Sequence, residues 1–177
     1  MSRNNSNIVE FTLIYNRHKK RIYNFVLKMV SDRMLCDDIV QDVFMKLYQN
    51  LEKIRNKNSI IYWLFRTARN DIYDYYRSKR IKVDQFNVAD TEDVEVRSSD
   101  NLEKELEQNE LKDLIMGELN KMDVGQREVY MLKEYGGLSY KEISVVMGID
   151  ENLVKSRLYK TRQKLINKFA KFYKTGV

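Results

Sequence analysis

Aromatic, amide and guanidinium side chains share one face of a helix expected from Ile60 to about Arg80. They recur at i, i+3, i+7, i+10 and i+14, as Trp63, Arg66, Asn70, Tyr73 and Arg77. Flat rings stack on unpaired bases, an amide hydrogen-bonds base edges, and arginine neutralises phosphates. The helix then runs into a cationic end that includes Lys79 and Arg80. This face predicts contact with separated strands of nucleic acid.

The opposite side of the same helix is apolar and is expected to face a core. It carries Ile61, Leu64, Phe65, Ala68, Ile72 and Tyr75. Two simpler interpretations stay open for the first face. Trp63 can itself belong to the core, and the basic end can be an ordinary cationic helix terminus, which the helix dipole favours.

A second pattern near the end of the chain predicts a helix, a tight turn and a basic helix. Ser139 and Glu142 have the spacing of a capping box, and Gly148 suits a helix end. The following helix is expected to bury Val154, Leu158 and Leu165. Its other faces carry Lys155, Arg157, Lys160, Arg162 and Lys164. A helix-turn-helix places its second helix in the DNA major groove, and a cationic face suits that placement. Two ordinary surface helices with a solvated charged face are the alternative.

A third surface is acidic rather than basic. A helix expected between the break at Ser31–Asp32 and Leu51 has an almost unbroken apolar stripe that begins at Cys36. Its other side shows Asp37, Asp38, Gln41, Asp42 and Met45. A polar helix face is normally just solvated, so this surface alone indicates no function.

The net charge of +6 is unevenly distributed along the 177 residues. Residues 1–83 hold 17 Lys and Arg against 8 Asp and Glu, residues 84–110 hold 2 against 10, and residues 111–177 hold 13 against 8. The first part of the acidic stretch lacks a helical stripe, and a helix is expected to begin near Leu102. We therefore predict a flexible, self-repelling linker over residues 84–108, between domains at 1–83 and 109–177.

The composition argues against several classes of function. Cys36 is the single cysteine, so no internal disulfide is expected, and no C-x-x-C motif or His/Cys cluster offers a metal site. No cofactor is expected. His18, the single histidine, lies on an apolar stripe, and the carboxylates are not gathered with histidines or phosphate-binding loops. An enzyme is therefore the least favoured class. The longest apolar run, residues 60–65, is too short to span a bilayer, and we expect a soluble cytoplasmic protein without membrane insertion.

The order of these motifs resembles that of an RNA polymerase sigma factor. The matching segments form three motifs, at 37–44, at 63–70 with 74–77, and at 138–143 with 154–158. The chain is similar to the small extracytoplasmic-function (ECF) group of the sigma-70 family, which keeps only the second and fourth conserved regions. Each motif is moderately specific, whereas the three in this order and at these separations are strongly so. The resemblance covers roughly residues 8–82 and 109–172.

The resemblance implies an all-α fold, with a region 2 helical bundle and a region 4 helix-turn-helix. It implies that region 2 docks on the clamp helices of core RNA polymerase through Asp38, Gln41, Asp42 and Met45. It also implies that region 2 reads the −10 promoter element and holds it open, with Asn70 lining a pocket for an extruded base. The accompanying residues are Arg55, Trp63, Arg66, Tyr73, Arg77, Lys79 and Arg80.

For region 4 the resemblance implies reading of the −35 element and contact with the polymerase flap. Lys155, Ser156, Tyr159 and Lys160 are expected to face the major groove, with Tyr140, Arg157 and Arg162 nearer phosphates. One departure limits this transfer. Asn152–Leu153 stand where the family commonly has Gly-Thr, so the phosphate contact of that threonine is not carried over.

These observations predict an alternative sigma factor that binds core RNA polymerase, recognises promoter DNA and promotes strand opening, with no catalytic residues of its own. An anti-sigma factor is a further expected partner. Two other classes stay open: a stand-alone helix-turn-helix regulator that binds duplex DNA without polymerase, and an RNA-binding or anti-termination protein. The stand-alone regulator leaves the acidic helix and the aromatic face without a role. The helix-turn-helix argues against the RNA-binding or anti-termination protein.

Overall fold

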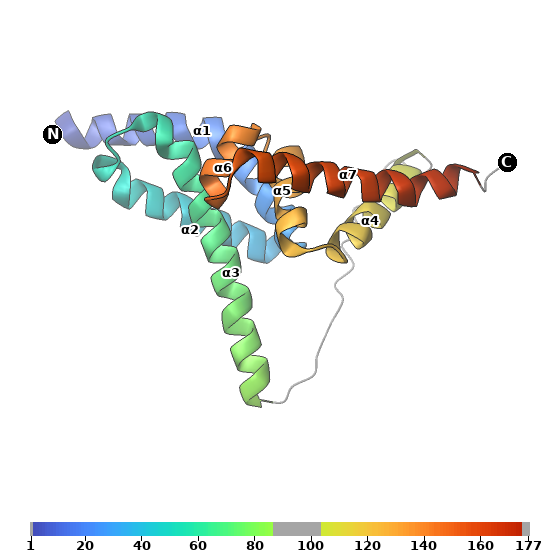
Figure 1. The fold of residues 1–177 in the computed structure, drawn as a ribbon. Helices are drawn as coiled ribbons and strands as arrows, with labels where there is room; N and C mark the ends of the chain where they lie inside the picture. Colours follow the sequence, from blue (N-terminus) through green and yellow to red (C-terminus); the bar gives the residue numbers. More distant parts are fainter. Residues whose placement is uncertain (1, 87–103, 175–177) are drawn as a thin grey trace.

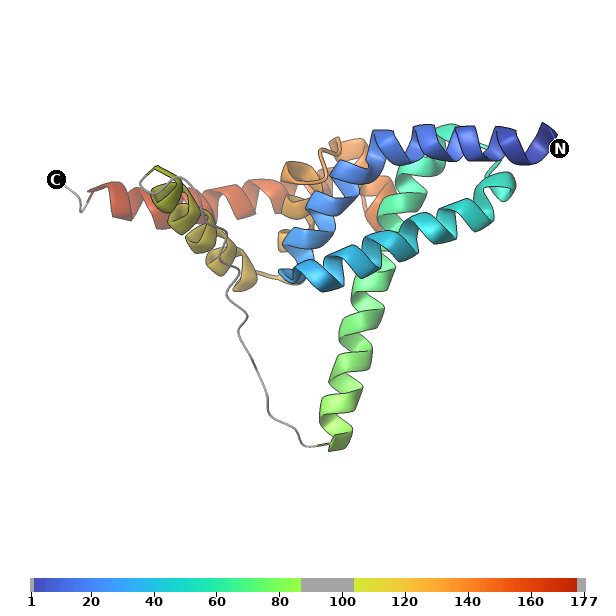
Figure 2. The same cartoon turned by 180° about the vertical axis from the view of Figure 1, so that it is seen from behind.

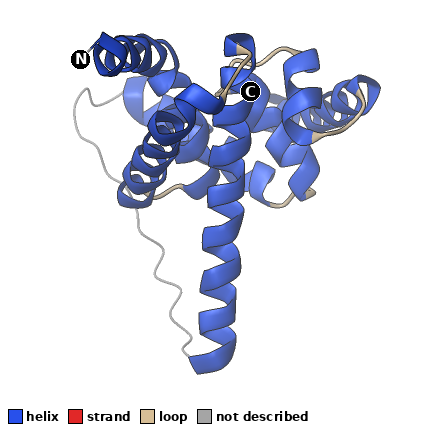
Figure 3. Ribbon diagram, turned by 90° about the vertical axis from the view of Figure 1, so that its left-hand side faces the viewer, coloured by secondary structure: helices blue, strands red, loops and turns tan. Residues whose placement is uncertain are grey.

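A computed structural model describes the backbone of residues 2–86 and 104–174 and the side chains of residues 6–80 and 110–170. The described part consists of helices and turns without a strand, which confirms the all-α prediction (Figure 3). The elements, in chain order, are α1 Ser2–Val30, α2 Arg33–Asn50, η1 Leu51–Lys53, η2 Lys57–Ser59, α3 Ile60–Phe86, α4 Lys104–Asn120, α5 Val124–Glu134, α6 Tyr140–Met147 and α7 Glu151–Lys174.

Helices α1, α2 and α3 pack against one another as a bundle (Figure 2). The turn between α1 and α2 lies where the sequence predicted a break, because Ser31 adopts a positive φ of 55°. The Asp32 side chain then caps α2 by accepting from the Leu35 backbone N–H at 3.0 Å. Cys36 is fully buried in this bundle, as its place on the apolar stripe indicated.

Helix α3 is longer than expected and ends at Phe86 instead of near Arg80. Residues 84–86, which were assigned to the linker, are therefore helical, because no proline or glycine interrupts this stretch. The second half of α3 extends away from the rest of the molecule (Figure 1). For this reason the core face ends at Ile72, and the prediction that Tyr75 is buried was wrong: the residue is 36% exposed. At the other end of the predicted linker, residues 104–108 belong to α4. Residues 87–103, with the helix start predicted near Leu102, lie outside the described ranges.

Helices α4 to α7 form the second group. Asp123 caps α5 by accepting from the backbone N–H groups of Gly125 at 2.9 Å and Gln126 at 3.3 Å. Ser139 and Glu142 form the predicted capping box at the start of α6. Gly148 ends α6 in the left-handed conformation, at φ 66°. Local side chains thus define the helix-turn-helix, and α4 lies alongside the second half of α7 (Figures 1 and 2).

The two groups of helices are packed against each other, and their buried side chains form one continuous core. Helix α3 contacts α6, and α1 contacts α5. Gly136, in the turn after α5, lies so close to Phe65 of α3 that an added Cβ would sit 2.9 Å from the ring. The sequence predicted the two groups but not their association.

Candidate nucleic-acid and polymerase interfaces

Helix α3 keeps its apolar face apart from a second face, called the mixed face, as the spacing indicated. The mixed face carries Trp63, Arg66, Asn70, Tyr73 and Arg77. Leu64, Phe65, Ala68 and Ile72 are buried, and Phe65 meets Phe25 of α1 edge to face, with ring centroids 5.5 Å apart. The mixed face turns away from this bundle. Trp63 is half-buried and packs on the edge of the core. Part of its side chain is therefore a packing surface, as the simpler interpretation held.

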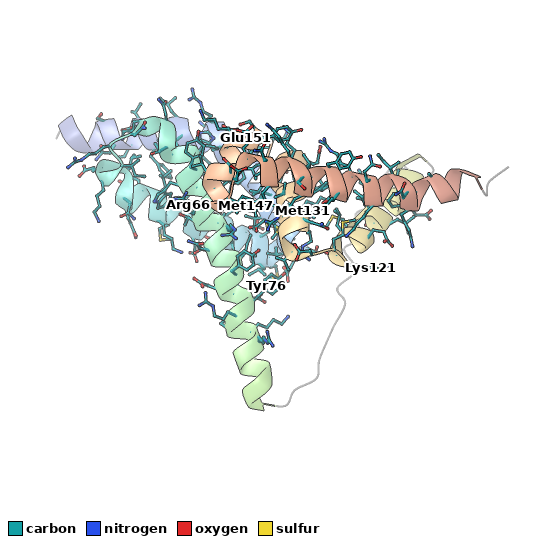
Figure 4. All side chains as sticks on the ribbon, viewed as in Figure 1. Arg66, Tyr76, Lys121, Met131, Met147 and Glu151 are labelled. Carbon is teal, nitrogen blue, oxygen red and sulfur yellow. The ribbon has the colours of Figure 1, made fainter. Side chains whose placement is uncertain are left out.

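The structure keeps the mixed face together but places the second group of helices over part of it. Arg66 donates to the backbone carbonyl of Val145 on α6 at 2.5 Å, and Figure 4 labels Arg66 on α3 and Met147 at the end of α6. The Tyr73 hydroxyl donates to Oε2 of Glu128 on α5 at 3.2 Å. Asn70 is exposed. Arg66 and Tyr73 are therefore engaged within the protein, while Asn70 faces solvent.

Arg69 belongs to the same cluster, although it was not among the predicted site residues. It follows Arg66 by three residues and precedes Tyr73 by four, so helical spacing alone places it at the edge of the mixed face. Its guanidinium forms an ion pair with Glu128, with Nη2 at 3.3 Å from Oε2, and lies 5.1 Å from the centroid of the Tyr73 ring.

Glu128 is the acceptor at the centre of this cluster and is only 1% exposed. Burial raises the pKa of Tyr73, and the charge of Glu128 adds to the rise, so the phenol stays protonated and able to donate. For Arg69, burial lowers the pKa, but the hydrogen bond and charge of Glu128 outweigh that effect and the net direction is upward. The cluster is therefore a carboxylate held by a cation and a phenol.

The remaining residues expected at the −10 element lie at the two ends of α3. Arg55 is exposed in the loop before the helix, where Asn56 caps η2 by accepting from the Asn58 N–H at 3.0 Å. Lys57 ties this loop to α1 through an ion pair with Glu10 at 2.7 Å. At the other end, exposed cations lie on the extended part of α3: Arg77, which pairs with Asp74, and then Lys79 and Arg80.

Helix α2 exposes all of the residues that were expected to meet polymerase. Asp38, Gln41, Asp42 and Met45 are exposed, while the stripe of Ile39, Val43, Phe44 and Leu47 on the other side is buried. Gln41 and Met45 also border a groove of about 950 Å³ between α1 and α2. Its aromatic lining was not predicted and includes Phe11, Tyr15, Phe44 and Tyr48. An acidic, amide-bearing rim beside an aromatic groove is suited to docking a protein.

The exposed side of α7 carries the residues that were expected to enter the major groove. Lys155, Ser156, Tyr159 and Lys160 are exposed, and Tyr159 reaches 65% exposure. Val154 and Leu158 are buried on the opposite side. Lys155 lies within 3.0 Å of Glu151 one turn earlier. The arrangement presents a cationic and hydroxyl-bearing helix face, which is the chemistry that reads base edges and phosphates.

The residues expected near phosphates are either half-buried or already paired within the protein. Arg157 is half-buried and lies against α5, where a Cβ on Gly125 would come within 2.6 Å of its guanidinium. Tyr140 is half-buried, with Lys133 Nζ at 5.0 Å from its ring centroid. Arg162 is exposed and paired with Glu134 at 2.6 Å. Their phosphate contacts stay predictions.

The described residues also bear on metal binding and on membrane insertion. No group of three or more His, Cys, Asp or Glu side chains there has an arrangement that could hold a metal ion. Within the same residues, no helix combines the length and the apolar character needed to cross a bilayer.

Comparison with known proteins places the chain in a family. The model of sigma-70 region 2 matches residues 14–81, and the model of sigma-70 region 4 matches residues 112–165. The ECF RNA polymerase sigma factor SigM of Bacillus subtilis is 32% identical over 164 residues, which cover 86% of this chain and 90% of that protein. The ECF RNA polymerase sigma-E factor of Haemophilus influenzae is 27% identical, over 89% of this chain and 86% of its own length.

Solved structures show the same fold. The sigma factor RpoE of Bartonella quintana, in complex with the anti-sigma factor NepR, superposes with a TM-score of 0.73 at 22% identity, over 89% of this chain and 95% of RpoE. CnrH, in complex with the cytosolic domain of CnrY, gives a TM-score of 0.64 at 24% identity, over 90% of this chain and 87% of CnrH. The matched regions contain the helices described above. The chain therefore belongs to the ECF group of the sigma-70 family and is an alternative sigma factor that acts with RNA polymerase.

Proposed function

We propose that this sigma factor directs core RNA polymerase to promoters by reading a −35 element with α7 and a −10 element with α3. The observation that carries the proposal is the exposure of two chemically different surfaces on one chain. The acidic side of α2 is suited to a protein partner, and the cationic side of α7 is suited to duplex DNA. A stand-alone regulator has no use for the first surface.

The residue assignments follow from this division of surfaces. Asp38, Gln41, Asp42 and Met45 of α2 would dock on the clamp helices of polymerase. The mixed face of α3 would hold separated −10 strands, with Asn70 receiving an extruded base. Extrusion costs a few kcal/mol, and stacking on aromatic rings offsets part of it. The exposed side of α7 would enter the −35 major groove.

The domain limits and the regulatory partner belong to the same proposal. We assign residues 1–83 to region 2, residues 84–108 to the connection between the regions, whose two ends belong to α3 and α4, and residues 109–177 to region 4. RpoE and CnrH are each similar in fold and were solved with an inhibitor or a partner domain. We propose that an anti-sigma factor likewise binds this chain. We also propose that the chain works in the cytoplasm and catalyses no reaction itself, the chemistry belonging to polymerase.

The test is run-off transcription from a library of promoter sequences with purified core polymerase and the full chain. We expect transcripts only when both proteins are present, from templates that share two sequence elements at a constant separation. The chain alone is expected to bind the same duplexes weakly. Tight, sequence-specific binding by the chain alone, without any support of transcription, would overturn the proposal in favour of a stand-alone regulator.

A further inference from the structure

The hydrogen bonds that join region 2 to region 4 in the described residues have a common direction. The donors are on region 2 and the acceptors are oxygens of region 4. Arg21 donates to the carbonyls of Gly136 at 2.8 Å and Gly137 at 2.9 Å. Arg66 donates to the Val145 carbonyl at 2.5 Å, and Arg69 and Tyr73 donate to the Glu128 carboxylate. Region 4 thus presents oxygen acceptors to cations, as a nucleic acid backbone does.

We propose that the chain without polymerase rests in a closed state, in which the buried carboxylate of Glu128 is a latch that engages Tyr73 and holds region 4 over part of the −10-reading face of α3, while Asn70 stays exposed. The inference rests on the proposed function, because α3 must be the −10 reader for this partial covering to matter. Arg66 and Tyr73 are both expected DNA contacts, and both are engaged by region 4 in this state. Their release requires α5 and α6 to move away from α3.

Burial of Glu128 explains why this residue can act as the latch. A buried carboxylate without partners is strongly unfavourable, whereas the same group paired with a cation and a phenol is tolerated. The partners of Glu128 in the described residues, Arg69 and Tyr73, both come from region 2. When the regions separate, water can solvate the carboxylate, so region 4 does not need the pair for its own fold. The pair therefore belongs to the interface between the regions.

The geometry of promoters makes the closed state incompatible with reading both elements. Elements centred near −35 and −10 lie on the order of 80 Å apart on B-form DNA, at about 3.4 Å per base pair. In the closed state Arg66 of the −10 face touches Val145 of the helix-turn-helix. The closed chain cannot span that separation.

The docking surface for polymerase stays accessible in the closed state. Asp38, Gln41, Asp42 and Met45 are exposed on α2, and the interface between the regions involves α1, α3, α5 and α6 instead. Polymerase can therefore bind first and then favour separation, if it binds the open state more tightly than the closed state. Free promoter DNA cannot use the acidic surface of α2 in this way, because DNA is itself negatively charged.

The experiment measures the distance between the regions by fluorescence transfer in the full chain. Dyes are placed at Met34→Cys near the start of α2, which lies beside the second group of helices in Figures 1 and 2, and at Asn167→Cys on α7, both exposed positions, while Cys36 is buried. We expect efficient transfer in the free chain and reduced transfer on adding core polymerase. Glu128→Gln is expected to raise the ratio of open to closed chain about tenfold, the effect of losing a hydrogen bond to a charged group. Arg21→Ala tests the other side of the interface without altering Glu128.

The matched control is Glu118→Gln, which removes a carboxylate from α4 that pairs with Lys121 and Lys168 inside region 4. This variant is expected to leave the transfer unchanged. Circular dichroism establishes whether each variant is folded. If Glu128→Gln does not fold, the transfer measured in Arg21→Ala tests whether weakening the interface opens the chain. Unchanged transfer in the folded variants would overturn the latch, and low transfer in the unmodified free chain would overturn the closed state.

A second measurement separates failure of the latch from failure of the proposed function. Binding of single-stranded −10 DNA by the free chain is expected to tighten about tenfold in Glu128→Gln, in step with opening. If Glu128→Gln opens the chain without tightening this binding, Glu128 does hold the two regions together, but α3 is not the −10 reader. If neither opening nor tighter binding follows, the latch is wrong and run-off transcription still tests the proposed function.

Discussion

The guanidinium of Arg162 on α7 donates to the carboxylate of Glu134 on α5 at 2.6 Å, so a cation expected to meet a DNA phosphate already has a partner. The pair joins the recognition helix to the helix that supports it. Both side chains are well exposed, at 44% and 38%, and an exposed ion pair of this kind contributes little to stability. Arg162 can therefore exchange Glu134 for a phosphate at small cost.

We expect Arg162→Ala to weaken all promoters alike, because a phosphate contact carries no sequence information. The salt dependence of promoter binding by the holoenzyme should flatten by about one ion. Glu134→Gln should have the opposite effect, since it frees the guanidinium. Binding is measured by a salt titration on two unrelated promoters. A change of preference between these promoters would place Arg162 at base edges instead.

The exposed lysines of α7 should set the preference at the −35 element. Lys155→Ala and Lys160→Ala are each expected to cost about 1–3 kcal/mol of promoter binding and to relax preference at one −35 position. The measurement is transcription of a promoter library with each variant. Lys164→Ala, farther along the helix, serves as the control. Unchanged preference in both test variants would leave the helix-turn-helix as a clamp without a role in readout.

Asn70 should matter most while the strands are being separated. We expect Asn70→Ala to reduce transcription from a closed linear promoter strongly, and from a promoter pre-melted at −10 much less. The reason is that the cost of extruding a base is already met in the second template. Run-off assays on the two templates provide the comparison. An equal loss on both would indicate a structural or phosphate role for Asn70.

The acidic side of α2 should be a docking surface for polymerase. The double variant Gln41→Ala with Asp42→Arg is expected to weaken binding to core polymerase at least about tenfold. Helicity and melting temperature should stay close to those of the parent, because exposed positions of this kind change stability by about 0.5 kcal/mol or less. Gln49→Ala, also exposed on α2, is the control. Normal binding by the folded double variant, or its unfolding, would show the assignment to be wrong.

The thiol of Cys36 should be unreactive in the folded chain. Burial raises its pKa to about 12, with the nearby charges of Asp37 and Asp32 adding to the rise, so very little thiolate exists at neutral pH. A disulfide reagent is expected to modify Cys36 at least about a hundredfold more slowly than a cysteine introduced at Gln49. Absorbance of the released thiol reports both rates, and denaturant should abolish the difference. Equal rates without denaturant would mean that the region 2 core opens readily.

The sequence by itself determined the elements whose partners are close along the chain. Ser139 and Glu142 lie three residues apart, and the reciprocal bonds of the capping box, at 3.2 Å and 2.7 Å, form within the first turn of α6. The stripe of α2 could also be read directly, because helical periodicity places its apolar side chains on one face whatever surrounds it. The exposed docking face of α2 and the exposed recognition face of α7 could be predicted as the sides of these helices that lie opposite the apolar stripes.

Only the tertiary structure decided which of the predicted site residues are accessible. Nothing in the local sequence connects Arg69 with Glu128, since 59 residues separate them and the pair forms only when α5 packs on α3. The same holds for Arg66 and Val145, 79 residues apart. Tyr75 was misplaced for a related reason: periodicity shows which face of a helix is apolar, but not where the neighbouring helices end. Burial depends on what packs against a side chain, and that is a property of the assembled fold.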